Sequence, residues 1–318
     1  MRIFEKTNFN IVGSRRKAYI GSGILLLISL ASFLVQGLEL GIDFKGGREF
    51  VVETAQVIAP TEVRIVLTDA LGQAPEVKTY GDVSAGSVAA LLIRTAGEGE
   101  TTEIQTRIIQ GIEEAFPDAS PRVVKTDVVG PRFADDLKRG SIYAVFGSLF
   151  VIFVYVMIRF EWRFGLGAVA ALFHDVAITL GIFSLLRSVM PFSLQIDQAI
   201  IAAFLTIVGY SLNDTVVIFD RIREFTNLYK TEPYQQVVNR SVNTTLSRTV
   251  ITSSTTLLVV VTLFIFGGEV LRGFAFALII GILIGTYSSV FVATPVVVEL
   301  HNRRLARVAA ASTQRRRR

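Results

Sequence analysis

The chain has 318 residues, of which 51% are hydrophobic and 19% are charged, and its mean hydropathy is +0.52. A soluble domain is typically about 45–50% apolar and about 25% charged, so this composition argues against an ordinary soluble enzyme. The chain has no cysteine, which excludes disulfides, thiolate nucleophiles and cysteine zinc sites. Its only histidines, His174 and His301, are too far apart in sequence for a histidine-rich metal site. We therefore expect neither a metal nor another cofactor.

Apolar residues gather in six segments, each close to the roughly 20 residues that a helix needs to cross a bilayer. These segments cover residues 18–38, 141–158, 164–186, 199–219, 250–266 and 274–298. A basic arm, residues 1–17, precedes the first segment, and a basic tail, 301–318, follows the last. The pattern predicts a polytopic α-helical membrane protein with six transmembrane helices.

Lys and Arg are concentrated in the arm, in the turn between the second and third spans, in segment 221–248 and in the tail. In a model with six spans all four regions lie on one side, and short basic loops stay in the cytoplasm. Both termini are therefore predicted to be cytoplasmic, with an amphipathic cytoplasmic segment near 221–248. The large loop 39–138 is exported.

The exported segment 39–138 has the composition of a folded domain. Strand and helix patterns alternate in it as strand, helix, strand, strand, helix and strand, over residues 50–52, 60–71, 76–80, 88–95, 101–116 and 122–129. This order predicts a ferredoxin-like α+β periplasmic domain between the first and second transmembrane helices. A bundle of five helices, residues 139–300, follows it.

Ionisable residues at membrane depth are the strongest functional signal. Each costs about 2.5–3.5 kcal/mol at the centre of a membrane helix, so such residues usually face a bundle interior and have a function. Asp214, with Asn213 beside it, lies in the fourth span, and Arg248 opens the fifth. We expect Asp214 and Arg248 to form a functional charge pair. The alternative is a static ion pair that only joins two helices.

Hydroxyl residues recur in the fifth span at spacings of three and four residues, which predicts one polar helical face. They begin at Thr245 and include Thr249, Thr252 and Thr256. Such a face can hold water, although Ser and Thr also pack helices together in membranes.

Two further sets of polar residues have less decided roles. His174 and Asp175 lie near the middle of the third span and form either a relay or a buried structural pair. Asp220 and Arg221, near the headgroups, are more typical of interfacial anchors. No glycine is followed directly by lysine, so the chain has no Walker A motif, and we expect no enzymatic activity.

Two motifs carry a family resemblance. The segment Gly41-Ile-Asp43-Phe-Lys-Gly46-Gly47 follows the first span, and residues 208–224, VGYSLNDTVVIFDRIRE, cover the cytoplasmic half of the fourth. Both segments, together with Ser247-Arg248-Thr249 in the fifth span, resemble the SecD/SecF protein-export family of the resistance–nodulation–division superfamily. The six spans and the single short exported domain are similar to the SecF members of that family.

The resemblance implies an accessory subunit of the Sec translocase in the bacterial inner membrane. It would pair with SecD, work with the SecYEG channel and possibly YajC, and use the proton-motive force to promote late export of an unfolded polypeptide. It implies that Asp214 and Arg248 belong to the proton pathway, lined by the hydroxyls of the fifth span. Asp43, Gly46, Gly47, Asp220 and Arg221 would be structural or gating residues of the motifs.

Two other functions remain open. One is a proton-coupled exporter of small molecules or lipids, although such exporters normally carry two halves of six spans and this chain carries one. The other is a passive membrane assembly factor whose buried charges only hold partners together. Nucleic acid is not an expected partner. The net charge of +5 divides into −7 over residues 39–138, from 10 basic and 17 acidic residues, and +12 over the remainder, so it reflects topology.

Overall fold

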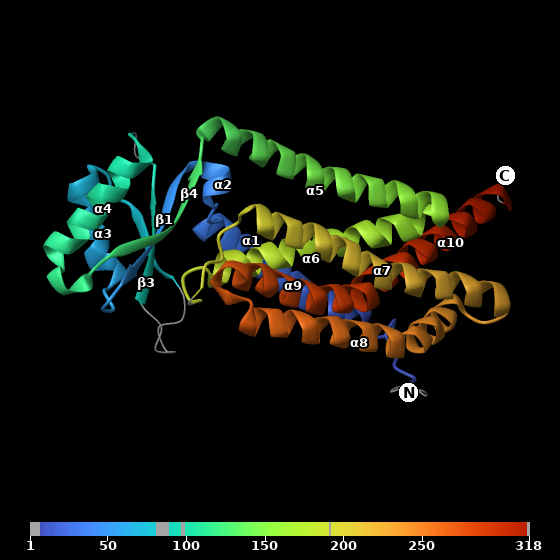
Figure 1. The fold of residues 1–318 in the computed structure, drawn as a ribbon. Coiled ribbons are helices and arrows are strands. Elements are labelled where there is room, and N and C mark those ends of the chain that lie inside the picture. The colour runs from blue at the N-terminus through green and yellow to red at the C-terminus, as the bar shows by residue number, and fades with distance from the viewer. Residues whose placement is uncertain (1–6, 81–88, 97–98, 191, 317–318) are drawn as a thin grey trace.

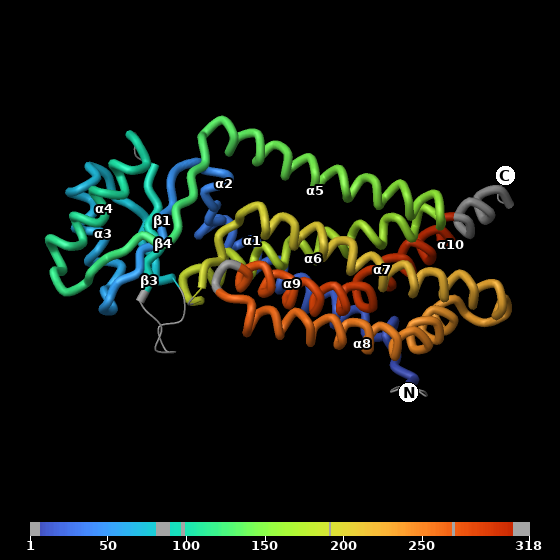
Figure 2. Tube along the Cα trace, viewed as in Figure 1, coloured from blue at the N-terminus to red at the C-terminus, as the bar shows by residue number. Residues whose placement is uncertain are grey.

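The computed structural model describes residues 7–80, 89–96, 99–190 and 192–316, and Figure 2 draws the remainder in grey. Residues 1–6 of the predicted arm, Val88 at the start of the third predicted strand, and residues 317–318 of the tail lie outside the described residues.

The described part of the chain contains six helical segments that are long and apolar enough to cross a membrane, which confirms the predicted number. The first five are α1 (Arg15–Gln36), α5 (Pro131–Arg159), α6 (Trp162–Leu186), α7 (Gln198–Leu228) and α8 (Tyr234–Phe266). The sixth runs through α9 (Gly268–Ser288), a π-helical turn η3 (Ser289–Ala293) and α10 (Thr294–Arg316). Figure 1 shows these helices lying roughly along one direction.

Several of these helices extend well beyond the apolar segments that predict them. Helix α5 begins at Pro131, ten residues before the predicted span, and α10 continues far into the predicted tail. Pro131 occupies the first turn, where a missing N–H costs nothing. Apolar runs mark only the part of a helix that lies in hydrocarbon, so they underestimate helices with polar ends.

Helices α6, α7 and α9 form the middle of the bundle, and small residues allow them close approach to their neighbours. A Cβ atom on Gly181 of α6 would lie 2.1 Å from the Cβ of Ser29 in α1. One on Gly281 of α9 would lie 2.3 Å from the side chain of Ile207 in α7. Such contacts are typical of helix packing in membranes, where close fit replaces the hydrophobic effect.

The segment between α1 and α5 forms a separate α+β domain. Its elements are α2 (Ile42–Lys45), β1 (Gly47–Thr54), α3 (Pro60–Leu71), β2 (Glu76–Tyr80), β3 (Ala89–Thr95), α4 (Thr101–Ala115), the short turn η2 (Pro117–Ala119) and β4 (Arg122–Val129). The sheet has the order β2-β3-β1-β4, and each neighbouring pair is antiparallel. This topology confirms the predicted ferredoxin-like arrangement.

One face of this sheet is covered by α3 and α4, as Figure 1 shows, and the domain core lies between them. Fully buried side chains there include Phe50, Leu67, Ile93 and Ile108. The opposite face is turned towards the helical bundle. It carries a second small apolar cluster with polar side chains around it. The sheet domain is therefore joined to the bundle through its open face.

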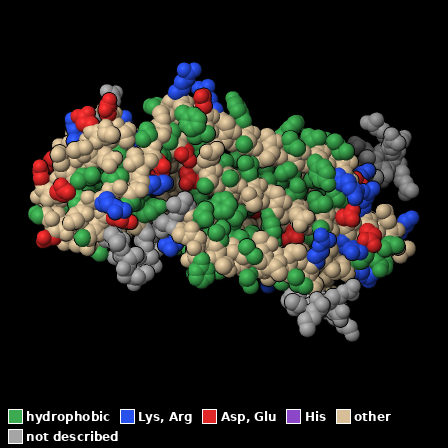
Figure 3. Space-filling view, in the orientation of Figure 1, with side chains coloured by type: hydrophobic (Ala, Val, Ile, Leu, Met, Phe, Trp, Pro, Cys, Tyr) green, Lys and Arg blue, Asp and Glu red, His purple; other side chains and the backbone are tan. Residues whose placement is uncertain are grey.

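Both termini lie at the end of the bundle opposite the sheet domain (Figure 1). In the space-filling view of Figure 3, Lys and Arg side chains gather at that end and hydrophobic side chains cover much of the middle. The exposed hydrophobic residues of α1, α5 and α8 account for much of this apolar surface. An apolar middle between polar ends is what a bilayer requires.

Candidate functional site

Asp214 lies within the bundle, on α7, and only 4% of the residue is exposed. It follows the first residue of α7, Gln198, by 16 positions, which corresponds to about 24 Å of helix. Its Oδ2 atom accepts no hydrogen bond from the described residues. Ser253 of α8 faces this carboxylate, and its hydroxyl also lies 2.7 Å from that of Thr286 in α9. A buried carboxylate with an open oxygen has the chemistry to take up and release a proton.

Arg248 of α8 acts on Asp214 electrostatically, yet the two residues form no ion pair within the described part of the chain. The Arg248 side chain is exposed on the outside of the bundle, and so is Asn213, the residue next to Asp214. The predicted charge pair is therefore not closed within this single chain. The carboxylate is therefore within the electrostatic reach of an exposed arginine without forming an ion pair with it.

The hydroxyl residues of α8 divide between two faces. Thr245, Thr249 and Ser253, spaced by four residues, are buried against the bundle. Thr252 and Thr256 are half-buried, and each donates a hydrogen bond to a carbonyl of its own helix. The sequence predicts one polar face, whereas the structure has two adjacent ones, one buried in the bundle and one half-buried. The buried hydroxyl of Thr249 has no hydrogen-bond partner among the described residues.

A second polar network lies deeper in the bundle, centred on Asp175 of α6. Its Oδ1 atom lies 3.0 Å from Nδ1 of His174. Its Oδ2 atom accepts hydrogen bonds from Ser211 of α7, at 2.6 Å, and Ser288 of α9, at 2.8 Å. The other ring nitrogen of His174 lies 3.1 Å from the hydroxyl of Ser22 in α1. Four helices therefore meet at one buried histidine–aspartate pair.

This network and Asp214 occupy successive turns of α7, because Ser211 precedes Asp214 by three residues. The hydroxyl of Ser289 in η3 donates to the carbonyl of Ser211 and lies 2.8 Å from the hydroxyl of Thr215. Polar groups thus lie along α7 from Ser211 to Thr215, beside both carboxylates. Sequence reasoning identified His174 and Asp175 but missed the serines around them, since a lone serine in a membrane helix is typical of packing.

The glycine motif after α1 lies where the sheet domain meets the bundle. Gly46 and Gly47 have φ angles of +73° and +124°, which side chains rarely adopt. A Cβ on Gly46 would lie 3.2 Å from the backbone of Pro131, and one on Gly41 would lie 3.1 Å from Asp197. The motif therefore contains glycine because the chain turns sharply here and passes close to the starts of α5 and α7.

A charged cluster lies at the same junction, on the open face of the sheet. Lys78 of β2 forms ion pairs with Glu39, which follows α1, and with Glu76 of β2. Arg94 of β3 pairs with Glu76 and also with Glu49 of β1. Sequence reasoning missed this cluster, because its members are separated along the chain and each is an ordinary charged residue in a soluble domain.

The two carboxyl groups of Glu39 and Glu76 share a hydrogen bond. Burial alone would raise the pKa of Glu39, but hydrogen bonds with Glu76, Lys78 and Gln195 outweigh it and lower the pKa to about 2. Burial, together with the hydrogen bond to Glu39 and its charge, raises the pKa of Glu76. Of the two carboxyl groups, Glu76 therefore takes up a proton more readily than Glu39.

Asp220 and Arg221 lie in the last third of α7, where Asp220 is exposed and Arg221 is half-buried. Asp220 pairs with Arg159 of α5 at 3.3 Å, and Arg221 pairs with Glu224 one turn further on, at 2.8 Å. Exposed pairs of this kind contribute little to stability. The described residues contain no group of three His, Asp or Glu side chains arranged to hold a metal ion.

The chain matches two family models. "Protein export membrane protein SecD/SecF, C-terminal" covers residues 110–303, and "SecD/SecF GG Motif" covers residues 31–56. Relatives include the protein translocase subunit SecF of Rhodothermus marinus, 64% identical over 96% of this chain and 98% of the relative. The SecF subunit of Cereibacter sphaeroides is 40% identical over 93% of this chain and 90% of the relative.

Among solved structures, the chain is similar to SecDF of Thermus thermophilus, described as a translocon-associated membrane protein. The TM-score is 0.81 at 35% identity, and the match covers 95% of this chain. A second structure, of SecDF in a super-membrane-facing form, gives a TM-score of 0.69 at 34% identity. In both cases the chain spans 40% of the length of the SecDF chain.

Proposed function

The chain belongs to the SecD/SecF protein-export family, as a non-enzymatic accessory subunit of Sec-dependent export in the inner membrane, and we propose that it couples proton movement through Asp214 to the late steps of export. The observation that carries this proposal is the buried carboxylate of Asp214, with one oxygen open and Arg248 beside it. An ionisable group held at this depth without a closed ion pair is costly, which favours a functional role.

The exposed position of Arg248 supports a site completed by a partner. A charged side chain facing hydrocarbon is unfavourable, so the outer face of α8 requires protein or water against it. SecD is the partner expected from the family, and its helices would cover Arg248 and Asn213 together. In this arrangement Thr249, Thr252 and Thr256 line the path by which a proton reaches Asp214, with SecD contributing further polar groups.

Proton entry can perform work only if protonation of Asp214 favours one arrangement of the helices over another. One proton moving through 100 mV releases about 2.3 kcal/mol, enough to shift such an equilibrium by more than tenfold. His174 and Asp175 of α6, which contact α7 through Ser211, form an additional relay. The basic end of the bundle faces the cytoplasm, and the sheet domain faces the periplasm near the SecYEG channel, YajC and the exported chain.

The test is export driven by the proton-motive force in inverted membrane vesicles that contain this subunit and SecD. Asp214→Asn and Arg248→Met should each abolish the stimulation of export by the proton-motive force. Glu114→Gln, at an exposed acid on α4 of the sheet domain and outside both motifs, is the control and should leave the stimulation intact. Full stimulation with both variants would refute the proton pathway and favour a passive assembly role.

A further inference from the structure

The connector between α1 and β1 is bound to the loop that precedes α7. Leu40 and Ile196 form a parallel β-bridge. The amide of Gly41 donates to the carbonyl of Ile196 at 2.8 Å, and the amide of Ile196 donates to the carbonyl of Glu39 at 2.7 Å. The backbone entering the sheet domain and the backbone entering α7 are therefore held together as two short neighbouring strands.

Asp43, within this connector, caps α7 from outside the helix. Its Oδ2 atom accepts a hydrogen bond from the amide of Gln198 at 2.9 Å, while Asp197 accepts one from the amide of Ile200 at 2.8 Å. Two backbone N–H groups in the first turn of α7 therefore donate to carboxylates, and one of these carboxylates comes from the connector. Carboxylates are favoured at this position because the amides and the helix dipole present positive charge.

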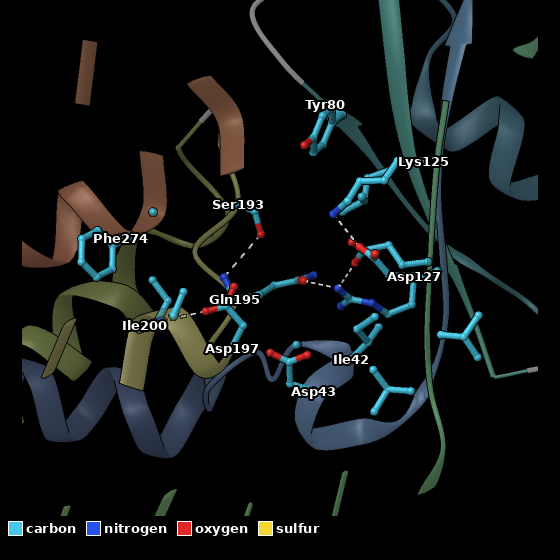
Figure 4. Close-up of a pocket in the computed structure, with 18 residues that line it drawn as sticks. Ile42, Asp43, Tyr80, Lys125, Asp127, Ser193, Gln195, Asp197, Ile200 and Phe274 are labelled. Atoms are coloured by element: carbon cyan, nitrogen blue, oxygen red, sulfur yellow. Dashed lines mark hydrogen bonds and ion pairs between the residues drawn. The ribbon is translucent and has the colours of Figure 1, made fainter. Parts of the chain in front are cut away.

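Gln195, in the same loop, connects α7 to the open face of the sheet. Its side-chain oxygen accepts a hydrogen bond from Arg94 of β3, at 2.5 Å. Its amide group donates to Glu39, at 2.6 Å, and to Glu76 of β2, at 3.1 Å. Gln195 is 6% exposed. Figure 4 shows it reaching from the bundle side towards the sheet, with Asp43 and Asp197 close by at the start of α7.

These contacts converge on the one helix that carries Asp214. On the basis of the proposed function, we infer that Asp43 and Gln195 are positioning residues that join the sheet domain, the connector and the start of α7 into one mechanical unit, so that a change at Asp214 moves the sheet domain. At the glycines of the motif, the backbone of the connector packs directly against the start of α5 and against the loop before α7. A continuous helix transmits displacement along its axis, and Asp214 lies 16 residues below the capped end.

The first test measures coupling directly. The chain has no cysteine, so two introduced cysteines, one on α4 and one on the periplasmic end of α8, can carry spin labels in the complex with SecD. In the parent chain, Asp214→Asn, which imitates the protonated state, should shift the distance between the labels. In an Asp43→Ala or Gln195→Ala background the shift should be lost, whereas Asp43→Asn, which retains a capping oxygen, should preserve it.

The second test restores the joint covalently. Leu40→Cys with Ile196→Cys places two cysteines on bridge partners, about 4.8 Å apart as in neighbouring strands, which a disulfide can span. The oxidised pair should retain the export rate of the reduced pair, and it should recover the export that Asp43→Ala loses. The control is Asp118→Asn, at an exposed acid of the sheet domain away from the junction, which should leave the export rate unchanged.

Several results would overturn the inference. These are a shift that persists in the Asp43→Ala background, the absence of any shift in the parent chain, or loss of export when the Leu40–Ile196 bridge is oxidised. The proposed function is judged separately, by the export rate of Asp214→Asn. Defective export with Asp214→Asn beside normal export with Asp43→Ala and Gln195→Ala would leave the proton pathway standing and remove the mechanical joint.

Discussion

Replacing Asp175 by alanine tests whether the buried network holds the bundle together. The side chain is 1% exposed, accepts hydrogen bonds from Ser211 and Ser288, and lies 3.0 Å from Nδ1 of His174. Hydrogen bonds between membrane helices are worth about 0.6 kcal/mol on average and up to about 1.7 kcal/mol. Loss of three such bonds should therefore lower the free energy of unfolding by about 2–5 kcal/mol. Asp175→Asn, which keeps the volume and one acceptor oxygen, should lose about half as much.

The assay is reversible unfolding of the purified chain in mixed micelles, by titration with a denaturing detergent and with helix content as the signal. Ser288→Ala serves as the reference for loss of one bond and should cost about 0.6–1.7 kcal/mol. A change below about 0.5 kcal/mol for Asp175→Ala would mean that the serine and histidine contacts do not stabilise the bundle, and the reasoning would be refuted.

The same variants separate a relay from a structural pair. Asp175→Asn cannot titrate, so a relay predicts loss of proton-driven export in a protein that remains folded. Ser288→Ala leaves both titratable groups in place and should retain export. If Asp175→Asn exports normally in vesicles, His174 and Asp175 are structural.

Three other predictions concern the junction, the helix contacts and the domain core. Because the pKa of Glu76 is raised by burial and by Glu39, the stabilisation it gives is complete below the ordinary value of 4.5 and declines as pH rises through the raised pKa. Hydrogen exchange of β2 should therefore accelerate with pH beyond its intrinsic dependence, and Glu76→Gln, which stays neutral, should abolish that excess. Gly281→Val forces a side chain into α7 and should cost about 1–3 kcal/mol in the detergent titration, whereas Gly147→Val, at an open position, should cost much less. Ile108→Ala removes a fully buried side chain and should destabilise the sheet domain by about 2–5 kcal/mol, measured by exchange of its strand amides, and a smaller loss would mean that the core collapses around the gap.

The fold could be predicted from the sequence because its two dominant patterns are local. Continuous apolar runs predict the membrane helices, and residues typical of turns separate the predicted strands of the sheet domain. Helix ends such as Pro131 could not be predicted from hydropathy, since they lie outside the hydrocarbon. The split βαβ order followed from element order alone, without knowledge of which strands pair.

The candidate site was only partly predictable, because its geometry depends on how each helix is rotated about its axis. Charge at membrane depth identified Asp214 and Arg248, but their spacing does not reveal that Arg248 faces outwards. Likewise, the junction depends on Gln195 meeting Arg94 across about a hundred residues of chain, which no local pattern contains.

The outward direction of Arg248 also determines what kind of site this is. A site closed within one chain would bury both charges against each other, at a desolvation cost that the ion pair seldom repays in full. Here the carboxylate is buried on α7 and the guanidinium lies on the surface of α8, so the electrostatic environment of Asp214 depends on whatever covers that surface. In the proposed function, a partner helix that moves against α8 would change the water and charge near Arg248, and through Arg248 the ease with which Asp214 takes up a proton. In the proposed function, division of the site between two chains would let assembly and helix movement control the proton, which a static internal pair could not do.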